Sequence, residues 1–310
     1  MKTFILNLLF VLFWQISFGQ DNFYAKEYGD SNNPTIIFLH GGPGYNAFSF
    51  EFSTAQKLAD NEFYVIVYDQ RGCGRTKPDT NSLYTFNEAF EDLNSIYKKY
   101  NVKTATLIGH SFGGTVGILF SKKYPEKVEN LILVGSPLSY QMTFKNIISR
   151  CKKIYSENSS PQLQYIEMLE KMDTTSLEYS SYCFMHAMPN GFYRAKNPSA
   201  KSKSINDSLK SNSMANYLSN MTREPVSGFF ENEHYTTLNL SSNLTEVKDK
   251  IKVFGIYGQE DGLFDTEQIA LLQSIIGTDR FTLVENASHS VFIDQQDVFI
   301  SLIKKYSSEK

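Results

Sequence analysis

Short apolar runs alternate with helical patterns along this chain, and the alternation restricts the fold more than any other feature of the sequence. Continuous apolar runs of this length are typical of strands whose two faces are both covered by helices, as in parallel sheets. We therefore predict an α/β protein with a doubly wound, mostly parallel sheet. The predicted strands span residues 36–40, 63–68, 105–109, 131–135, 253–258 and 281–285, and the predicted helices span about 85–100, 114–124, 266–276 and 294–306. A capping box, Thr85-Phe86-Asn87-Glu88, opens the first of these helices.

The alternation is interrupted once, between about residues 138 and 247. This stretch contains no apolar strand and is rich in Ser, Asn, Lys, Tyr and Met. We interpret it as a helical cap inserted after the sixth strand, above the strand ends where such sheets place their sites. The alternative is a separate domain without a role in catalysis, but the strands predicted at 253–258 and 281–285 resume the sheet and favour an insertion. The core is then divided into residues 20–137 and 248–310.

Residues 1–19 differ from the rest of the chain. Lys2 gives a positive start, residues 4–18 are almost wholly apolar, and Ser17 and Gly19 are small residues suited to a cleavage site before Gln20. This pattern predicts a secretory signal peptide and therefore an exported protein, periplasmic or secreted. The alternative is an uncleaved anchor, although the apolar run is shorter than the ~20 residues of a spanning helix. No later segment resembles a membrane span.

Charge and cysteine content exclude several classes of partner and cofactor. The net charge is −3 with both signs scattered along the chain, so no basic block indicates a nucleic-acid surface. Cys151 and Cys183 could pair in an oxidising compartment, with Cys73 left over, but ordinary buried thiols are the alternative. The sequence has no CxxC or HExxH pattern, and we expect neither a metal nor an organic cofactor.

The motif Gly109-His110-Ser111-Phe112-Gly113 matches G-x-S-x-G, the nucleophile elbow. A predicted strand precedes the motif and a predicted helix follows it, as the elbow requires. Its serine lies on a sharp turn at the N-terminus of a helix, where the helix dipole favours developing negative charge. We therefore predict Ser111 as a catalytic nucleophile.

A serine nucleophile needs a base, and the base needs an acid that orients it. In folds with this elbow the chain order is serine, acid, histidine. His289 is the one histidine that follows the last predicted strand, so we predict it as the base. Asp261 follows the strand at 253–258 and is the predicted acid, with Asp265 and Glu260 as alternatives.

The oxyanion formed during acyl transfer needs two backbone N–H donors. The first is predicted to be the N–H of Phe112, the residue after the nucleophile. The second should come from the glycine-rich loop after the strand at 36–40, where we select Gly42. Pro43 has no N–H group and cannot serve.

Two further motifs make the sequence recognisable. Residues 40–44 read HGGPG and residues 69–76 read DQRGCGRT. Together they resemble the prolyl aminopeptidase (proline iminopeptidase) family of α/β-hydrolases. The resemblance covers roughly residues 36–137 and 250–292 and is thin across the insertion. It implies the α/β-hydrolase fold and a serine peptidase that removes an N-terminal residue, often proline.

The resemblance also implies a site for the free amine of the substrate. In that family acidic groups of the cap hold the ammonium, and a Glu-Asn-His-Tyr segment lies late in the cap. Residues 231–235 of this chain read ENEHY, with one extra residue. Glu231 or Glu233 is therefore a candidate amine anchor, the alternative being a surface carboxylate. By the same account Asp69 and Arg71 are expected to be structural.

These observations predict an exported aminopeptidase that acts on short peptides with N-terminal proline or a small apolar residue. The first alternative is a carboxylesterase or amidase of the same fold, because relatives with this sheet signature include enzymes that do not use the amine. The second is a non-catalytic, hydrolase-like binding protein. The expected partner is a small peptide or ester, and the sequence does not indicate an oligomeric state.

Overall fold

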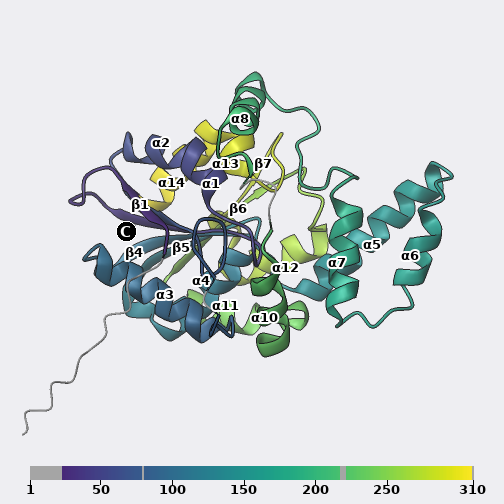
Figure 1. The fold of residues 1–310 in the computed structure, drawn as a ribbon. Coiled ribbons are helices and arrows are strands. Elements are labelled where there is room, and N and C mark those ends of the chain that lie inside the picture. Colours follow the sequence, from purple (N-terminus) through teal and green to yellow (C-terminus); the bar gives the residue numbers. More distant parts are fainter. Residues whose placement is uncertain (1–22, 79, 217–220, 309–310) are drawn as a thin grey trace, which may run out of the picture.

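The computed structural model describes residues 23–78, 80–216 and 221–308, and its fold is drawn in Figure 1. The predicted signal peptide lies outside this range. Within it, no helix is long and apolar enough to cross a membrane. The three cysteines are free thiols, so the Cys151–Cys183 bond is not formed in this structure.

A seven-stranded sheet forms the centre of the molecule, in the order β1-β3-β2-β4-β5-β6-β7. All neighbouring strands are parallel except β1, which pairs antiparallel with β3. The mostly parallel sheet is therefore confirmed, and each predicted strand is present. The strands are β1 (Ala25–Tyr28), β2 (Thr35–Leu39), β3 (Tyr64–Tyr68), β4 (Ala105–His110), β5 (Val128–Val134), β6 (Lys252–Gly258) and β7 (Phe281–Val284).

Helices cover both faces of the sheet, and strand side chains alternate between two apolar cores. In β2, Ile37 and Leu39 enter one core, whereas Ile36 and Phe38 enter the other. The first core is covered by α3 (Phe86–Lys99), α4 (Phe112–Lys123), α11 (Ser241–Lys248) and α12 (Thr266–Ile276). The second is covered by α1 (Phe48–Phe50), a π-helical turn (Glu51–Ala55), α2 (Gln56–Ala59), α13 (Val291–Asp294) and α14 (Gln296–Ser308). Short 3₁₀ turns at Pro125–Lys127 and Thr278–Arg280 lead into β5 and β7.

Helix α3 begins at the capping box that the local sequence predicts. Thr85 Oγ1 accepts a hydrogen bond from Glu88 N at 3.2 Å, and the Glu88 carboxylate accepts one from Thr85 N at 3.0 Å. The predicted capping box is therefore present. In contrast, β1 was not predicted, because its residues AKEY are half-exposed at the sheet edge and form no apolar run.

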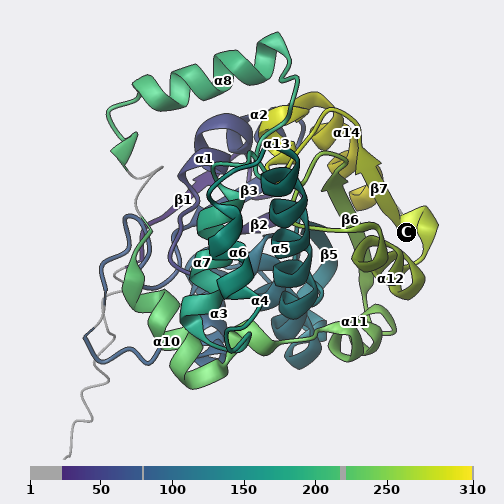
Figure 2. The ribbon, with the colours of Figure 1, turned by 90° about the vertical axis from the view of Figure 1, so that its right-hand side faces the viewer.

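The insertion between β5 and β6 is helical and contributes a lobe that extends beyond the sheet (Figures 1 and 2). Its described helices include α5 (Tyr140–Glu157), α6 (Leu163–Leu169), α7 (Leu177–Ala187), α8 (Ala200–Ser211) and α10 (Arg223–Glu233), and a 3₁₀ turn follows at Tyr235–Thr237. It follows the fifth described strand and not the sixth, because a single strand, β1, precedes the parallel set. Phe144 and Phe229 of the insertion share one apolar core with Phe112 of the sheet region, so the two parts pack as one body. Helix α11, within the range assigned to the cap, packs against α4 and α12 beside the sheet.

Candidate active site

Ser111 lies at the turn between β4 and α4, in the strained backbone that the elbow motif predicts. Its φ and ψ are 52° and −123°, in a region that residues other than glycine rarely adopt. The turn is anchored to β5, since Ser111 N donates to Val134 O at 3.0 Å. Two residues after Val134, Ser136 Oγ donates to Ser111 O at 2.7 Å. The serine is therefore raised at the carboxyl end of the sheet by contacts with its neighbouring strand.

The two glycines of the motif allow this turn to close. A Cβ at Gly109 would lie 2.5 Å from Gly114 Cα, and a Cβ at Gly113 would overlap the carbonyl of Leu39 in β2. Any side chain here would push α4 away from the sheet. The glycines are therefore required by the close approach of strand and helix.

His289 and Asp261 form a buried pair at the same end of the sheet. His289 Nδ1 lies 2.8 Å from Asp261 Oδ2, and both residues are 5% exposed. Asp261 Oδ1 accepts a second hydrogen bond from Leu263 N at 3.0 Å, which fixes the carboxylate plane. The alternative acids have other partners: Asp265 caps α12 through Gln268 N, and Glu260 accepts from Lys196 N. The structure thus joins Asp261 to the imidazole.

The residues after β5 bring this pair next to the serine. Val134 accepts the Ser111 N–H group, and a Cβ on the following residue, Gly135, would lie 3.1 Å from His289 Nδ1 and 3.3 Å from Asp261 Oδ2. His110, which precedes the serine, provides a second link. Its ring centroid is 4.8 Å from that of His289, and its Nε2 lies 3.1 Å from His289 O. Three distant chain segments therefore meet at the carboxyl end of the sheet.

In the sequence His110 is only a variable position of the elbow motif, and its role follows from the structure. Burial, together with the neighbouring His289, holds its pKa well below the ordinary value, so the ring is neutral. Because its Nε2 faces a carbonyl oxygen, that nitrogen carries the proton and donates to His289 O. The residue holds the backbone that carries the predicted base.

The glycine-rich loop after β2 approaches the serine as predicted. A Cβ at Gly41 would lie 2.9 Å from Ser111 Cβ. His40 Nε2 accepts from Gln70 N at 2.9 Å, so Nδ1 carries the proton and donates to Gly41 O at 2.8 Å. The Gly41–Gly42 peptide group is planar and trans, so its C=O and N–H point in opposite directions. Because Gly41 O is held toward His40, the Gly42 N–H points away from His40.

Phe112 is the other residue predicted to donate a hydrogen bond to the oxyanion. It is the first residue of α4, so its N–H group has no partner within the helix. Its ring is buried and packs against Phe229 of α10 with centroids 4.9 Å apart. The backbone donor therefore lies at the serine while the side chain is held by the cap.

The motif at 69–76 makes its contacts within the protein. Asp69 is fully buried and accepts hydrogen bonds from the guanidinium of Arg75 and from Ala47 N. Arg71 makes a two-pronged contact with Asp92 on α3 and an ion pair with Glu88. Burial raises the pKa of Asp92 to about 6, although Arg71 opposes the shift. These contacts hold the loop against α3.

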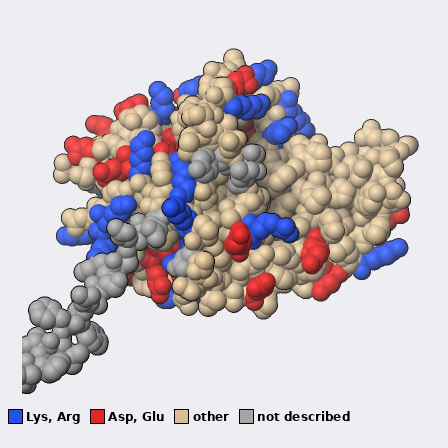
Figure 3. All heavy atoms as spheres, viewed as in Figure 1, with Lys and Arg blue, Asp and Glu red and all other residues tan. Residues whose placement is uncertain are grey.

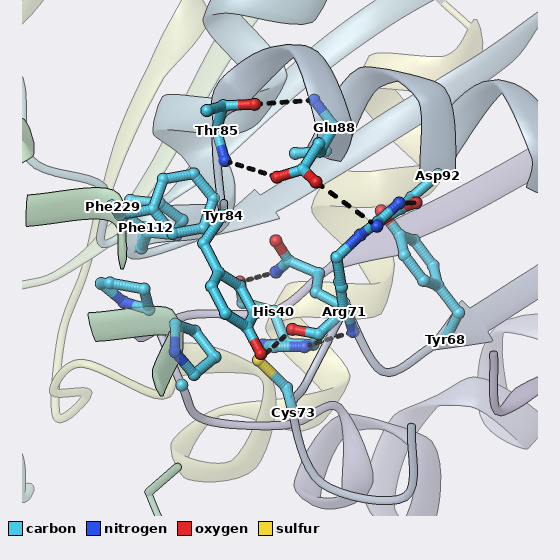
Figure 4. Close-up of a pocket in the computed structure, with 15 residues that line it drawn as sticks. His40, Tyr68, Arg71, Cys73, Tyr84, Thr85, Glu88, Asp92, Phe112 and Phe229 are labelled. Atoms are coloured by element: carbon cyan, nitrogen blue, oxygen red, sulfur yellow. Dashed lines mark hydrogen bonds and ion pairs between the residues drawn. The ribbon is translucent and has the colours of Figure 1, made fainter. Parts of the chain in front are cut away.

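A small hollow lies beside these charges, as Figure 4 shows. Arg71, Glu88 and Asp92 lie on one side of it, and Phe112 and Phe229 lie on the other. The free space inside is comparable to one water molecule. We therefore regard it as a packing feature behind the glycine-rich loop and not as a substrate pocket.

The two candidate amine anchors are not brought to the serine by any contact in the described part of the chain. Glu233 Oε1 accepts from Phe86 N at 2.7 Å, at the first turn of α3. The neighbouring Asn232 Nδ2 donates to Leu83 O at 2.8 Å, which docks the end of α10 on the same loop. Glu231 is exposed. Glu233 is therefore already engaged in holding the cap to α3.

The cap nevertheless contributes to the site through other residues. Tyr193, between α7 and α8, places its ring perpendicular to His289 with centroids 5.1 Å apart. Thr222 N donates to Gly44 O at 2.8 Å, which connects the start of α10 to the glycine-rich loop. Residues of the insertion therefore lie beside His289 and the glycine-rich loop. Tyr193 had no sequence signal, because isolated tyrosines are common in the insertion.

A second, open groove lies on the outer lobe, between α5, α6 and α7. It is lined by apolar and aromatic side chains, and Figure 3 shows few charges on the visible face of this lobe. Its exposed members include Met168, Met185, Tyr165 and Tyr182.

Among the residues that the structure covers, no group of three or more His, Cys, Asp or Glu side chains is arranged to hold a metal ion.

Comparisons with known proteins identify the family of this fold. The sequence matches the family described as alpha/beta hydrolase fold over residues 34–296. Proline iminopeptidase PfmaB of Pestalotiopsis fici is 26% identical over 287 residues, which cover 90% of this chain and 93% of that protein. A proline iminopeptidase-related protein from Thermus thermophilus superposes with a TM-score of 0.67 at 20% identity, over 91% of this chain and 92% of its own. An esterase from Exiguobacterium antarcticum has a TM-score of 0.63 at 16% identity, over 93% and 96% of the two chains. The chain belongs to the alpha/beta hydrolase fold family, as a hydrolase similar to proline iminopeptidases.

Proposed function

We propose that the protein is a serine hydrolase with Ser111 as nucleophile, His289 as base and Asp261 as the acid that orients the base. The observation that carries the proposal is the buried 2.8 Å contact between His289 and Asp261 beside the strained turn at Ser111. Because Asp261 engages Nδ1, the other ring nitrogen of His289 is left to exchange a proton with the serine.

The reaction is acyl transfer to water in two steps. His289 takes the Ser111 proton as the hydroxyl oxygen attacks the scissile carbonyl, and the oxyanion accepts hydrogen bonds from Phe112 N and Gly42 N. His289 then gives the proton to the leaving group, and the acyl-enzyme forms. A water molecule, deprotonated by His289, attacks the acyl carbonyl and restores the serine.

The leading substrate class is a short peptide with N-terminal proline or a small apolar residue. Support comes from the similarity to proline iminopeptidases across most of the chain and from the HGGPG and DQRGCGRT motifs. We further propose that residues 1–19 direct export and are removed before Gln20. Mass spectrometry of the protein isolated from its native host tests this directly: a mature chain that still begins at Met1 contradicts the proposal.

The second candidate is a carboxylesterase or amidase that does not require a free amine. One observation favours it: Glu233 is engaged by Phe86 N, and Glu231 is exposed. Under this reading the cap closes the site by packing Phe229 and Tyr193 over it and does not bind an ammonium group.

Three chromogenic substrates separate these functions: proline p-nitroanilide, its N-acetyl derivative and p-nitrophenyl butyrate. An aminopeptidase cleaves only the free amine, whereas equal cleavage of both anilides or faster cleavage of the ester favours the second candidate. Ser111→Ala and His289→Ala should each lower turnover by about 10⁶-fold. Full activity of Ser111→Ala would refute the triad, and silence toward all substrates and a fluorophosphonate probe would favour a binding protein.

A further inference from the structure

The segment between α7 and α8 returns from the cap and contacts both loops of the proposed Asp–His pair. Phe192 O accepts from Gly262 N at 2.8 Å, next to Asp261. Tyr193 O lies 2.9 Å from Ser288 Oγ, next to His289. Two successive carbonyl groups of the cap therefore connect the loop of the acid with the loop of the base.

Ser288 is also held by a further buried acid, Asp294. Its N–H donates to Asp294 Oδ2 at 2.8 Å, and its Oγ lies 2.6 Å from the same oxygen. Asp294 is at the end of α13 and is 8% exposed, while Ser288 is 1% exposed. Asp294 Oδ1 also accepts from Ser202 Oγ of α8 at 3.3 Å. This carboxylate thus contacts both the base loop and the cap.

The hydrogen-bond count explains why Asp294 and Ser288 act together. Ser288 Oγ has one hydrogen but lies within bonding distance of two oxygens, Tyr193 O and Asp294 Oδ2. Both contacts are satisfied when Asp294 carries a proton and donates it to Ser288 Oγ, which then donates to Tyr193 O. Burial raises the pKa of Asp294, while the hydrogen bonds from Ser288 and Ser202 oppose the shift.

We propose that Asp294, acting through Ser288, is a positioning residue that keeps His289 directed at Asp261 and couples the base to the cap at Tyr193. The proposal rests on the triad assigned above. An imidazole must be placed to within a fraction of an ångström, and a shift of about 1 Å can cost about 100-fold in rate. The contacts to Asp294 fix the residue immediately before the imidazole.

A matched control is available in the same part of the fold. Asp297, three residues after Asp294, is also an acid and also contacts α8, through Lys201. Its side chain is 77% exposed, and it has no described contact with the base loop. Asp297→Asn should therefore leave catalysis unchanged.

The test compares Asp294→Ala, Asp294→Asn, Ser288→Ala and Asp297→Asn with the wild type, using the best of the three chromogenic substrates. Asp294→Ala should lower kcat by about 10- to 100-fold with KM changed less than about twofold. Asp294→Asn should lie between it and the wild type, because an amide oxygen still accepts from Ser288 N. Ser288→Ala should lower kcat at least several-fold. Thermal unfolding shows which of the variants are folded.

A second readout does not depend on turnover. The low-field proton resonance of the His289–Asp261 hydrogen bond, absent in His289→Ala, should broaden or disappear in the Asp294 and Ser288 variants and persist in Asp297→Asn. Asp294→Asn and Ser288→Ala with wild-type kcat, or with an unchanged resonance, would overturn the proposal even if Asp294→Ala did not fold. Activity that survives Ser111→Ala would instead refute the triad, and the resonance still decides the role of Asp294.

Discussion

Replacing Glu233 by alanine removes the acceptor for Phe86 N at the first turn of α3. A hydrogen bond to a charged group contributes about 1.5–3 kcal/mol to stability. A carboxylate at a helix N-terminus adds about 0.3–1 kcal/mol. Because Glu233 is partly exposed, solvent screens the interaction, and we expect Glu233→Ala to lower the free energy of unfolding by about 1–2 kcal/mol.

Two variants serve as controls for this prediction. Glu233→Gln keeps an oxygen that can accept from Phe86 N and loses the charge, so it should cost less than about 1 kcal/mol. Glu231→Ala changes an exposed side chain on the same helix and should remain within about 0.5 kcal/mol of the wild type.

Urea unfolding at pH 7 measures the stability, and the same preparations are assayed with proline p-nitroanilide. If Glu233 only holds the cap, Glu233→Gln leaves KM nearly unchanged. The reasoning is refuted if Glu233→Ala is as stable as the wild type while KM rises for the free amine and not for its N-acetyl derivative. That result would identify Glu233 as the amine anchor.

Three further predictions follow from the packing around the site. Gly113→Ala places a Cβ against the carbonyl of Leu39 and should displace the start of α4. We therefore expect a lower thermal unfolding midpoint and a reduced kcat, and an unchanged midpoint would contradict the close approach. Phe229→Ala removes a ring packed on Phe112 and should destabilise the protein by about 3 kcal/mol in denaturant unfolding, with a loss below about 1 kcal/mol arguing against this contact. The pKa of Asp92 is about 6 in the folded protein against an ordinary 3.8, so the folded state binds this proton more tightly than the unfolded state. Protonation of Asp92 therefore stabilises the fold fully below about pH 4, and this stabilisation is lost as pH rises through about 6. Relative to Asp92→Asn, the wild type should therefore lose stability between about pH 4 and 6, and a parallel pH profile for the two proteins would show that the pKa is not raised.

The sheet and most of its helices were predictable because their signals are local. The strand at β6 and the helix α12 follow from apolar runs and caps contained within a few residues, and Thr85 with Glu88 marks the start of α3 without any tertiary contact. The motif around Ser111 was equally recognisable from local sequence, because a predicted strand precedes it and a predicted helix follows it. The contact that excludes a side chain at Gly113 is not local, since a Cβ there would overlap Leu39 of β2.

Contacts between distant segments decided the rest. Asp261, Asp265 and Glu260 lie close together in the sequence, and only the folded chain shows that Asp261 meets the imidazole while Asp265 caps a helix. Glu233 matched a family pattern in sequence, yet its carboxylate is taken by a backbone N–H 147 residues away. Periodicity and composition indicate which secondary structure a short stretch of the chain favours. They carry no information about which of several similar carboxylates reaches a given partner, because that choice depends on how the cap and the sheet are packed together.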